Sequence, residues 1–503
     1  MSPGADSVEH LARRVTKLTS VLDVAKAMAA ARDLESLLPL IIFEAAKVVD
    51  ADRCTLFVLD RDRGELWSKV AQGAAKEIRV KLGRGIAGTV AETGEAINIT
   101  DAYQDARFNR DIDLTTGYRT RTVLCVPMRD AAGEVTGVLQ ALNKHEGTFG
   151  EEDTELLLAL GGQAAGAIEN ALLHEEINLL FEGFVAASVV AIESRDPTTA
   201  GHSGRVASLT VNLAQALEHV DRGPYAEVRF STQDVQEIRY ASLLHDFGKV
   251  GVREPVLVKA EKLYPHELAV LEARFEVARK DLMVRSYQRR LASVGLLGEK
   301  ALPEIEAEEE KRLANELSEL DEMRDFVLAC NKPTVLARDG FERLSEVARF
   351  NFHDGHGQPR SLLIPRELEC LSIPRGSLSA GERTEIESHV THTFRFLSQI
   401  PWTRALRRVP AIAYAHHERL NGRGYPRAIP AQEIPVQSKM MAIADVYDAL
   451  TAADRPYKKA VPMVQALSII EQESKAGMLD EELFRVFVQA EVPRNALGAV
   501  RSS

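Results

Sequence analysis

Histidines and aspartates recur beside apolar helical runs in the second half of the chain, and these residue types could hold metal ions. The seven residues that we select as metal ligands are His202, His245, Asp246, His389, His416, His417 and Asp445. A single histidine is more often a surface or core residue than a ligand. A carboxylate on an apolar helix, however, is costly to bury without a partner. Five histidines and two aspartates, each on or beside such a run, therefore favour a buried metal centre.

These residue types also indicate a chemistry. Imidazole and carboxylate ligands without thiolate suit iron or manganese, with zinc as a further candidate. Asp246 could bridge two ions through its two oxygens, and two ions roughly 3.5–4 Å apart are a known arrangement for hydrolysing phosphate esters. Lys249 follows His245 and Asp246 by one helical turn, so we expect it on the same face. It could protonate a leaving oxygen or clamp a phosphate, which makes Asp246 and Lys249 the candidate catalytic residues.

Composition limits the class of protein. The chain has 503 residues and a formal charge of -12, which argues against a general nucleic-acid binder. Its four cysteines lie far apart and form no CxxC pair, so neither a zinc ribbon nor a disulfide framework is indicated. No apolar run approaches the roughly 18 residues of a membrane span, and the first residues lack a signal pattern. We expect a soluble, cytoplasmic protein without a membrane partner.

The first part of the chain predicts an α+β domain. Residues 1–33 are expected to form a helix with an apolar stripe of Leu11, Val15, Leu18 and Leu22. Residues 34–172 then predict a helix, a hairpin, a glycine-rich loop (GRGIAGTVAETG), a second hairpin and a closing helix. That order fits helices on an antiparallel sheet.

A long helix is expected to follow, from about Glu151 to Ser194, with its last part, residues 173–194, as a linker. Its apolar stripe comprises Ile168, Leu172, Ile177, Leu180 and Phe184. A helix of this length between two domains usually packs against a copy of itself. We therefore expect a homodimer through residues 34–194, with a helix lying on its own domain as the alternative.

The remaining chain predicts an all-α domain at residues 195–490, followed by a tail at 491–503. Residues 262–380 stand apart as a large, mostly helical insertion. Its segment EIEAEEEKRLANELSELDEM is highly charged, with Leu313, Leu317 and Leu320 at helical spacing. This pattern is typical of an exposed helix or helical hairpin, and NFHDGHGQPRSLLIP is expected to be a loop or small hairpin.

The motifs RDPTTAGHSGRVA, HDFGKVGV, HHE…GYP and IADVYDALTAADRPYK resemble, in this order, those of the HD-GYP family, a branch of the HD phosphohydrolases that hydrolyses cyclic dinucleotides. The resemblance covers about residues 180–260 and 381–490. It implies one ion held by His202, His245, Asp246 and Asp445 and a second held by Asp246, His389, His416 and His417. Lys249 takes the place of the family lysine. Arg455 and Lys458 match residues that contact substrate, and we add Arg423 and Tyr425 to the substrate-binding set.

Three departures from the family pattern matter. Asn421 replaces an aspartate, and Ala428 replaces a glycine after the GYP motif. Thr198 occupies a position where some members carry a glutamate that helps to bind a third ion, so we expect two ions. The turn at residues 424–426 could form the rim of the site or present a surface to a protein partner, and a plain turn is the alternative.

Residues 34–172 resemble a GAF sensor domain. Asn143, Lys144, Phe149 and Asp153 match the NKFDE signature of GAF domains that bind cyclic mononucleotides, although Thr154 takes the glutamate position. The resemblance implies cAMP or cGMP as the GAF ligand. A dimerisation domain without a ligand is the alternative.

The combined expectation is a bacterial GAF and HD-GYP signalling enzyme. It would be a binuclear phosphodiesterase that opens c-di-GMP to linear pGpG and further to GMP, under control of the GAF domain. Two alternatives stay open. One is hydrolysis of 3′,3′-cGAMP, and the other is a catalytically weak c-di-GMP receptor or scaffold.

Overall fold

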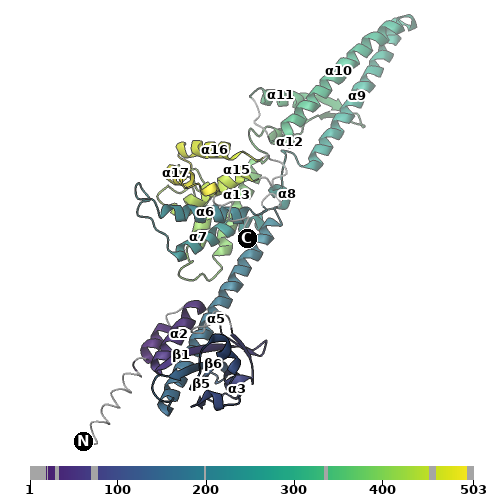
Figure 1. Cartoon of the computed structure of the whole chain (residues 1–503). Helices are drawn as coiled ribbons and strands as arrows, with labels where there is room; N and C mark the ends of the chain where they lie inside the picture. Colours follow the sequence, from purple (N-terminus) through teal and green to yellow (C-terminus); the bar gives the residue numbers. More distant parts are fainter. Residues whose placement is uncertain are drawn as a thin grey trace, which may run out of the picture. The chain divides into compact units, whose positions relative to one another are not determined.

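The computed structural model describes residues 19, 21–28, 33–68, 78–196, 200–333, 338–452 and 460–494. Contacts within the chain define two compact units, Met1–Gly183 and Phe184–Ser503. Figure 1 labels the main elements of each unit. Among the described helices, none combines the length and apolar character that a bilayer crossing requires.

A six-stranded antiparallel sheet lies at the centre of the first unit, in the order β3-β2-β1-β6-β5-β4. Its strands are β1 Ala51–Asp60, β2 Glu65–Ser68, β3 Ile78–Lys81, β4 Ile97–Ile99, β5 Val123–Arg129 and β6 Val135–Lys144. The two predicted hairpins are β1–β2 and β5–β6, and β1 pairs with β6 in the middle of the sheet. The prediction of helices on an antiparallel sheet is confirmed, and β3 and β4 extend the sheet beyond the predicted strands.

Helices cover both faces of this sheet. Helix α2 (Leu34–Val48) begins at Asp33, as predicted, because the Asp33 carboxylate accepts a hydrogen bond from the Ser36 amide at 2.7 Å. Side chains of α2 and of α5 (Glu151–Glu193) share one apolar core with β1, β5 and β6. Helix α3 (Gly85–Thr93) packs on the opposite face.

The predicted glycine-rich loop is wrong, because its residues form α3. Ile86 and Val90 are buried one turn apart, so the segment has a core-facing side despite its glycines. A side chain at Gly88 would come within 2.4 Å of the Lys81 carbonyl oxygen. Glycine is therefore required for helix–strand contact, and it does not mark a loop here. A short 3₁₀ helix η1 (Ala102–Gln104) and α4 (Arg110–Thr116) follow α3.

The first helix differs in phase from its prediction. Residues 21–28 are helical, but their buried side chains are Val21, Val24 and Met28, whereas Leu22 is 63% exposed. The predicted stripe mixes two faces, since leucine spacing alone cannot identify the face that meets the sheet domain. The other stripe residues, Leu11, Val15 and Leu18, lie outside the described residues.

Helix α5 is continuous over 43 residues. Its first half packs on the sheet through Leu157, Leu160 and Ile168. Of the predicted stripe, Ile177, Leu180 and Phe184 are exposed, as expected for a helix that pairs outside its own fold. Dimerisation through this helix stays a prediction.

The second unit is helical around a core of α6 (His202–Leu217), α7 (Thr232–Leu244), α13 (Ala380–Leu397) and α15 (Val436–Thr451). Shorter elements connect and flank them: η3 Phe247–Gly251, α8 Glu254–Leu257, α14 Val409–Tyr414, α16 Met463–Lys475 and α17 Glu481–Gln489.

The segment predicted to be an insertion has an apolar core of its own. Helices α9 (Pro265–Leu297) and α10 (Leu302–Asn331) form an antiparallel hairpin joined at η4 Glu299–Ala301 (Figure 1). The ion pairs Arg279–Asp321 and Arg289–Glu309 link the two helices. Helix α11 (Arg338–Arg349), the hairpin β7–β8 (Asn351–His353 and Pro359–Ser361) and α12 (Pro365–Leu371) complete this part.

Candidate metal centre

Five elements of the second unit bring the seven predicted ligands together. His202 is the first residue of α6, and His245 and Asp246 follow the last turn of α7. His389 lies within α13 and Asp445 within α15, while His416 and His417 follow α14. Possible ligand atoms gather in two clusters, each within 4.8 Å: Asp246 with His389, His416 and His417, and His202 with His245 and Asp445.

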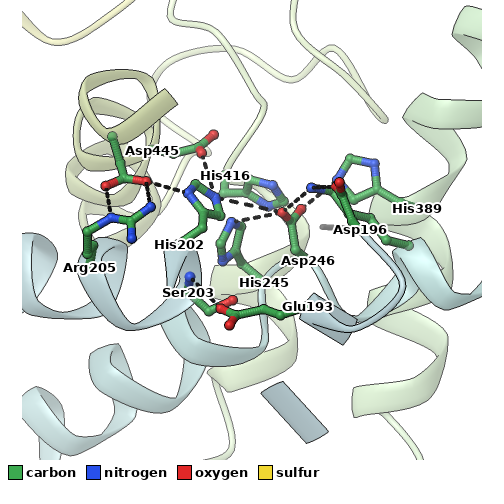
Figure 2. A network of polar contacts seen from close by, with 12 residues as sticks. Glu193, Asp196, His202, Ser203, Arg205, His245, Asp246, His389, His416 and Asp445 are labelled. Carbon is green, nitrogen blue, oxygen red and sulfur yellow. Dashed lines mark hydrogen bonds and ion pairs between the residues drawn. The ribbon is translucent and has the colours of Figure 1, made fainter. Parts of the chain in front are cut away.

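Asp246 lies between the two clusters. Its Oδ1 is 3.2 Å from His389 Nε2, whereas its Oδ2 is 3.5 Å from His245 Nε2 and 3.8 Å from His202 Nε2. Figure 2 shows this carboxylate among the three rings. Because each oxygen faces a different cluster, the geometry suits a carboxylate that bridges two cations.

Three of the histidines share one arrangement. The Nδ1 atoms of His245, His389 and His416 lie 2.6–2.7 Å from the carbonyl oxygens of Ser242, Ile386 and Ala413. A carbonyl can only accept, so Nδ1 carries the proton in each ring. The Nε2 atoms of the same rings are buried and have no hydrogen-bond partner among the described residues. This orientation by a backbone carbonyl is typical of metal-binding histidine.

The charge states fit cation binding. Burial, with added repulsion from His245, lowers the pKa of His416 to about 3, and burial also lowers the pKa of His245. Both rings are therefore neutral at pH 7 and present a lone pair at Nε2. Burial would raise the pKa of Asp246, but the nearby charge of Lys249 holds it well below its usual value. Neutral imidazoles around an ionised carboxylate are the donor set that a divalent cation needs.

His202 is oriented by two residues that the sequence motifs do not single out. Its Nδ1 lies 2.7 Å from Asp448 Oδ2, and Arg205 Nε donates to Asp448 Oδ1 at 2.6 Å. On the other side, His202 Nε2 is 3.3 Å from Asp445. Burial opposes protonation, yet Asp445 and Asp448 outweigh it and raise the pKa of His202 to about 9. The sequence signal that could have identified Asp448 is its position three residues after Asp445 on one helix.

Lys249 contacts the bridging carboxylate directly. It lies in η3 rather than on α7, because α7 ends at Leu244, yet its Nζ is 2.8 Å from Asp246 Oδ2 and 3.3 Å from Asp196 Oδ2. Burial would lower the pKa of Lys249, but the charges of Asp246 and Asp196 raise it. The lysine is therefore a cation that can donate a proton or a hydrogen bond at the edge of the site.

Glycine in the HDFGK motif permits the contact between η3 and α13. A side chain at Gly248 would lie 1.9 Å from the His389 carbonyl oxygen and 2.4 Å from the Thr393 amide. The Gly248 amide instead donates to Thr393 Oγ1 at 2.8 Å, and this hydroxyl donates to the His245 carbonyl at 3.0 Å. Close packing of these two segments holds Asp246 against His389.

The turn after His417 is fixed by Glu418. This buried carboxylate accepts hydrogen bonds from the amides of Arg427 and Ile429 at 2.9 and 3.2 Å. A side chain at Gly424 would come within 2.3 Å of the Arg419 amide, so glycine is required. The Tyr425 ring consequently lies 4.7 Å from the His417 ring, at the second cluster.

The residues predicted to bind substrate differ in where the structure places them. Tyr425 lies beside the ligands, whereas Arg423 is exposed. Arg455, Lys458 and Thr198 lie outside the described residues. Their predicted parts in substrate or third-ion binding stay predictions.

The four NKFDE-like residues of the first unit bind one another and the fold. Lys144 Nζ is 2.8 Å from Asp153 and donates to the Val49 carbonyl at 3.1 Å. Asn143 accepts from the Arg121 amide at 2.6 Å, and Phe149 is buried.

A cavity of about 740 Å³ opens beside the sheet of this unit, and its lining includes none of these four residues. Asn143 reaches its wall only through Tyr118, whose hydroxyl it contacts at 2.9 Å. The cationic residues in the lining are Arg53, Arg79, Lys81, Arg84 and Arg107.

Family models match both units. A GAF domain model matches residues 33–168, and an HD domain model matches residues 356–483. The HD match contains His389, His416, His417 and Asp445, while His202, His245 and Asp246 precede it. The chain therefore combines a GAF domain with a helical region that carries an HD domain.

Curated proteins similar to this chain include two 3′,5′-cyclic phosphodiesterases. The probable 3′,5′-cyclic phosphodiesterase pde-5 of Caenorhabditis elegans is 36% identical over 210 residues, which cover 38% of this chain and 28% of that protein. The dual 3′,5′-cyclic-AMP and -GMP phosphodiesterase 11A of Takifugu rubripes is 41% identical over 166 residues, 30% of this chain and 18% of that protein. The chain thus spans less than a third of either relative.

Among solved structures, the GAF domain of a phosphoenolpyruvate-protein phosphotransferase from Coxiella burnetii is similar, with 26% identity and a TM-score of 0.30. The match covers 32% of this chain and 98% of that one.

Proposed function

We propose that the chain is a metal-dependent phosphodiesterase of cyclic nucleotides, with the cyclic dinucleotide c-di-GMP as its first substrate. The observation that carries the proposal is the position of Asp246, with one oxygen toward each of two histidine clusters. Three buried imidazole nitrogens near this carboxylate have no hydrogen-bond partner in the described part of the chain. The donor set is thiolate-free and suits iron or manganese, with zinc as a further candidate.

The proposed ligands divide as the clusters do. His202, His245 and Asp445 would hold one ion, His389, His416 and His417 the other, and Asp246 would bridge them. Bound divalent ions would supply a hydroxide nucleophile and neutralise charge on the phosphate. Asp448 holds the His202 ring through Nδ1, and the backbone carbonyls of Ser242, Ile386 and Ala413 hold three further rings.

Lys249 has the geometry of a proton donor. Its ammonium lies within 2.8 Å of the bridging carboxylate, and its raised pKa keeps it charged. We propose that Lys249 protonates the leaving sugar oxygen or binds the scissile phosphate. Tyr425, beside His417, would contact the substrate from the rim of the second cluster.

A 3′,5′-cyclic mononucleotide is the second candidate substrate, because the relatives named above are a probable 3′,5′-cyclic phosphodiesterase and a dual 3′,5′-cyclic-AMP and -GMP phosphodiesterase. The test is metal analysis of the full chain together with turnover of c-di-GMP, 3′,3′-cGAMP, cAMP and cGMP. Two ions per chain and fastest opening of c-di-GMP are expected. Faster turnover of cAMP or cGMP would reject the dinucleotide. Full metal loading without turnover of any of the four would reject the enzyme and favour a receptor.

We infer that the cavity of the first unit accepts a cyclic mononucleotide. Its cationic lining suits a phosphate, and Phe57, Ile86 and Phe108 provide apolar surface for a base. Because α5 continues from this unit into the second, a ligand could alter turnover, provided that it binds the two states unequally.

The test of this site is calorimetric titration of the full chain with cAMP and cGMP, with Arg84→Ala and the exposed Arg63→Ala as a matched pair. We expect roughly tenfold weaker binding only in Arg84→Ala. Equal binding by both variants would reject the cavity as the site.

A further inference from the structure

Helix α9 carries apolar side chains that the described part of the chain leaves open to solvent. The exposed fractions are 58% for Val270, 40% for Val277, 51% for Val284, 60% for Tyr287 and 75% for Leu291. Single exposed apolar residues are common on soluble proteins. Eight large apolar side chains of α9 are exposed, and the regular spacing of these five calls for an explanation.

Their spacing is that of a coiled-coil seam. Val270, Val277, Val284 and Leu291 follow one another at seven-residue intervals. A second row, three residues further on in each repeat, consists of Ala273, Lys280, Tyr287 and Val294. These rows occupy the a and d positions of a heptad, which form a seam only against another helix. Four heptads lie within the 33 residues of α9.

The insertion fold does not use this face. Its own core takes Leu271, Phe275 and Leu282 from the opposite side of α9. Arg289 and Glu309 pair at 2.9 Å and fix α9 to α10 on that side as well. The seam is therefore additional to what holds the helical hairpin together.

We propose that the α9 seam binds the α9 seam of a second copy of this chain, antiparallel about a two-fold axis. A two-fold interface must be self-complementary. With the axis near Leu282 and Met283, Ala273 faces Leu291 of the second copy, and Val277 faces Tyr287. In each of these two pairs a small side chain meets a larger one, and the two-fold axis repeats the pairs at both ends of the seam.

Flanking charges favour the antiparallel direction. Glu276 and Arg290 flank the seam at the g positions. An antiparallel pair places Glu276 of each copy beside Arg290 of the other, so the contact occurs twice. Glu276 is 61% exposed, and the Arg290 Nε is buried without a hydrogen-bond partner among the described residues. A parallel pair would instead place Glu276 beside Asp281, which offers it no positive charge.

The least favourable contact in this arrangement would be between Asp281 and Asp281 of the second copy, which lie near each other across the axis. Its side chain is 9% exposed and lies 2.7 Å from Arg285, and it accepts a hydrogen bond from the His353 amide. The carboxylate is thus turned toward its own chain and neutralised. This proposal goes beyond the proposed phosphodiesterase and does not depend on it.

Cysteine cross-linking of the full chain tests the pairing. Met283→Cys places two thiols near the axis, whereas the two copies of Val270→Cys lie about 36 Å apart in the antiparallel pair, at about 1.5 Å per residue. The four natural cysteines are buried, which keeps the background low. A short bismaleimide should join Met283→Cys and not Val270→Cys. Cross-linking of Val270→Cys would indicate a parallel pair, and no cross-linking at either position would leave α9 without a second copy. Both results overturn the proposal.

Charge exchange supplies a second, independent readout in the Met283→Cys background. Glu276→Arg or Arg290→Glu alone should lower cross-linking about fivefold, because each opposes like charges twice. The double variant should restore it, and so should a mixture of the two single variants. Circular dichroism of each variant checks that the helical hairpin is folded. Equal cross-linking in all variants would reject the register.

Discussion

Two polar clusters of this chain differ in whether their buried atoms have partners. In the first unit, both oxygens of Asp153 accept hydrogen bonds, from Lys144 and from the Gly150 amide. In the second unit, the Nε2 atoms of His245, His389 and His416 have no hydrogen-bond partner among the described residues. A satisfied buried network stabilises a fold, whereas buried lone pairs without partners mark a place for a cation.

The largest expected effect tests the unsatisfied cluster. Asp246→Ala should remove the bridge between the two ligand sets, so both metal and turnover should be lost. Metal analysis and phosphodiesterase assays measure this, with Asp246→Asn as a variant that keeps the volume and removes the charge. Wild-type metal content in either variant would contradict a bridging role.

The second effect is a loss of turnover with unchanged metal content. Lys249→Ala should keep the metal and slow turnover by roughly 10²–10⁴-fold, because it removes a proton donor. Lys249→Arg keeps the charge and should recover part of the rate if the residue only binds phosphate. Loss of metal from Lys249→Ala would instead make the lysine structural.

The third effect tests the satisfied cluster. Lys144→Met leaves the Asp153 carboxylate buried without its cationic partner, since the Lys144 side chain is 15% exposed and that of Asp153 is 7% exposed. Breaking such a pair costs about 3–5 kcal/mol. Unfolding of the first unit can be followed through Trp67 in a Trp402→Phe background. Lys26→Met, in an exposed pair with Asp23, is the control and should change little.

Metal content should be unchanged in Lys144→Met. A drop in metal would mean that the two clusters are not independent, and an unchanged melting temperature would mean that the NKFDE-like residues do not hold the fold.

The fourth effect concerns Glu382, a hydrogen-bonded carboxylate in the first turn of α13 in the second unit. Glu382 accepts hydrogen bonds from Lys259 at 2.8 Å and from the Tyr264 hydroxyl at 2.6 Å. Burial opposes its ionisation, but these bonds lower the pKa of Glu382 to about 2, from an ordinary value of 4.5. Because the folded pKa is depressed, the stabilisation is complete above pH 4.5 and is lost as the pH falls toward 2.

Glu382→Gln should therefore destabilise the second unit by about 1–3 kcal/mol at pH 7, and the difference from wild type should shrink below about pH 4.5. Trp402 fluorescence in a Trp67→Phe background follows this unit. Glu471→Gln, in an exposed pair with Lys475, is the control. A difference as large at about pH 3 as at pH 7 would show that the carboxylate charge is not the cause.

Sequence motifs select the candidate ligands better than the residues that orient them. His245 and Asp246 are adjacent, and His416 and His417 are adjacent, so motif spacing alone selects them as candidate ligands. Asp448 escapes prediction because its role depends on contact with His202 and Arg205, which are more than 240 residues away in sequence.

The same limit applies in the first unit. Glycine at 88 resembles a loop signal in the sequence, yet it is required by the approach to the Lys81 carbonyl. Asn143, Lys144, Phe149 and Asp153 match a ligand-binding signature, but a motif does not reveal that the residues satisfy one another. In both cases the role of the residues depends on contacts between distant segments, which spacing along the chain does not reveal.

The smallest expected effect tests how strictly the turn beside the metal centre is built. Ala428 has φ +52°, a left-handed conformation that favours glycine, and the family pattern has glycine at this position. Ala428→Gly should stabilise the second unit by about 0.5 kcal/mol, because relief of backbone strain exceeds the entropy that glycine loses on folding. Gly422 offers the reverse change, since it has φ +69° and a Cβ added there would meet no atom within 4 Å. Gly422→Ala should therefore cost about 1 kcal/mol through the backbone alone. Both shifts are measured by thermal unfolding of Trp402, with metal content as the second readout. If Ala428→Gly lowers stability or releases metal, the turn depends on the alanine side chain, and the backbone explanation fails.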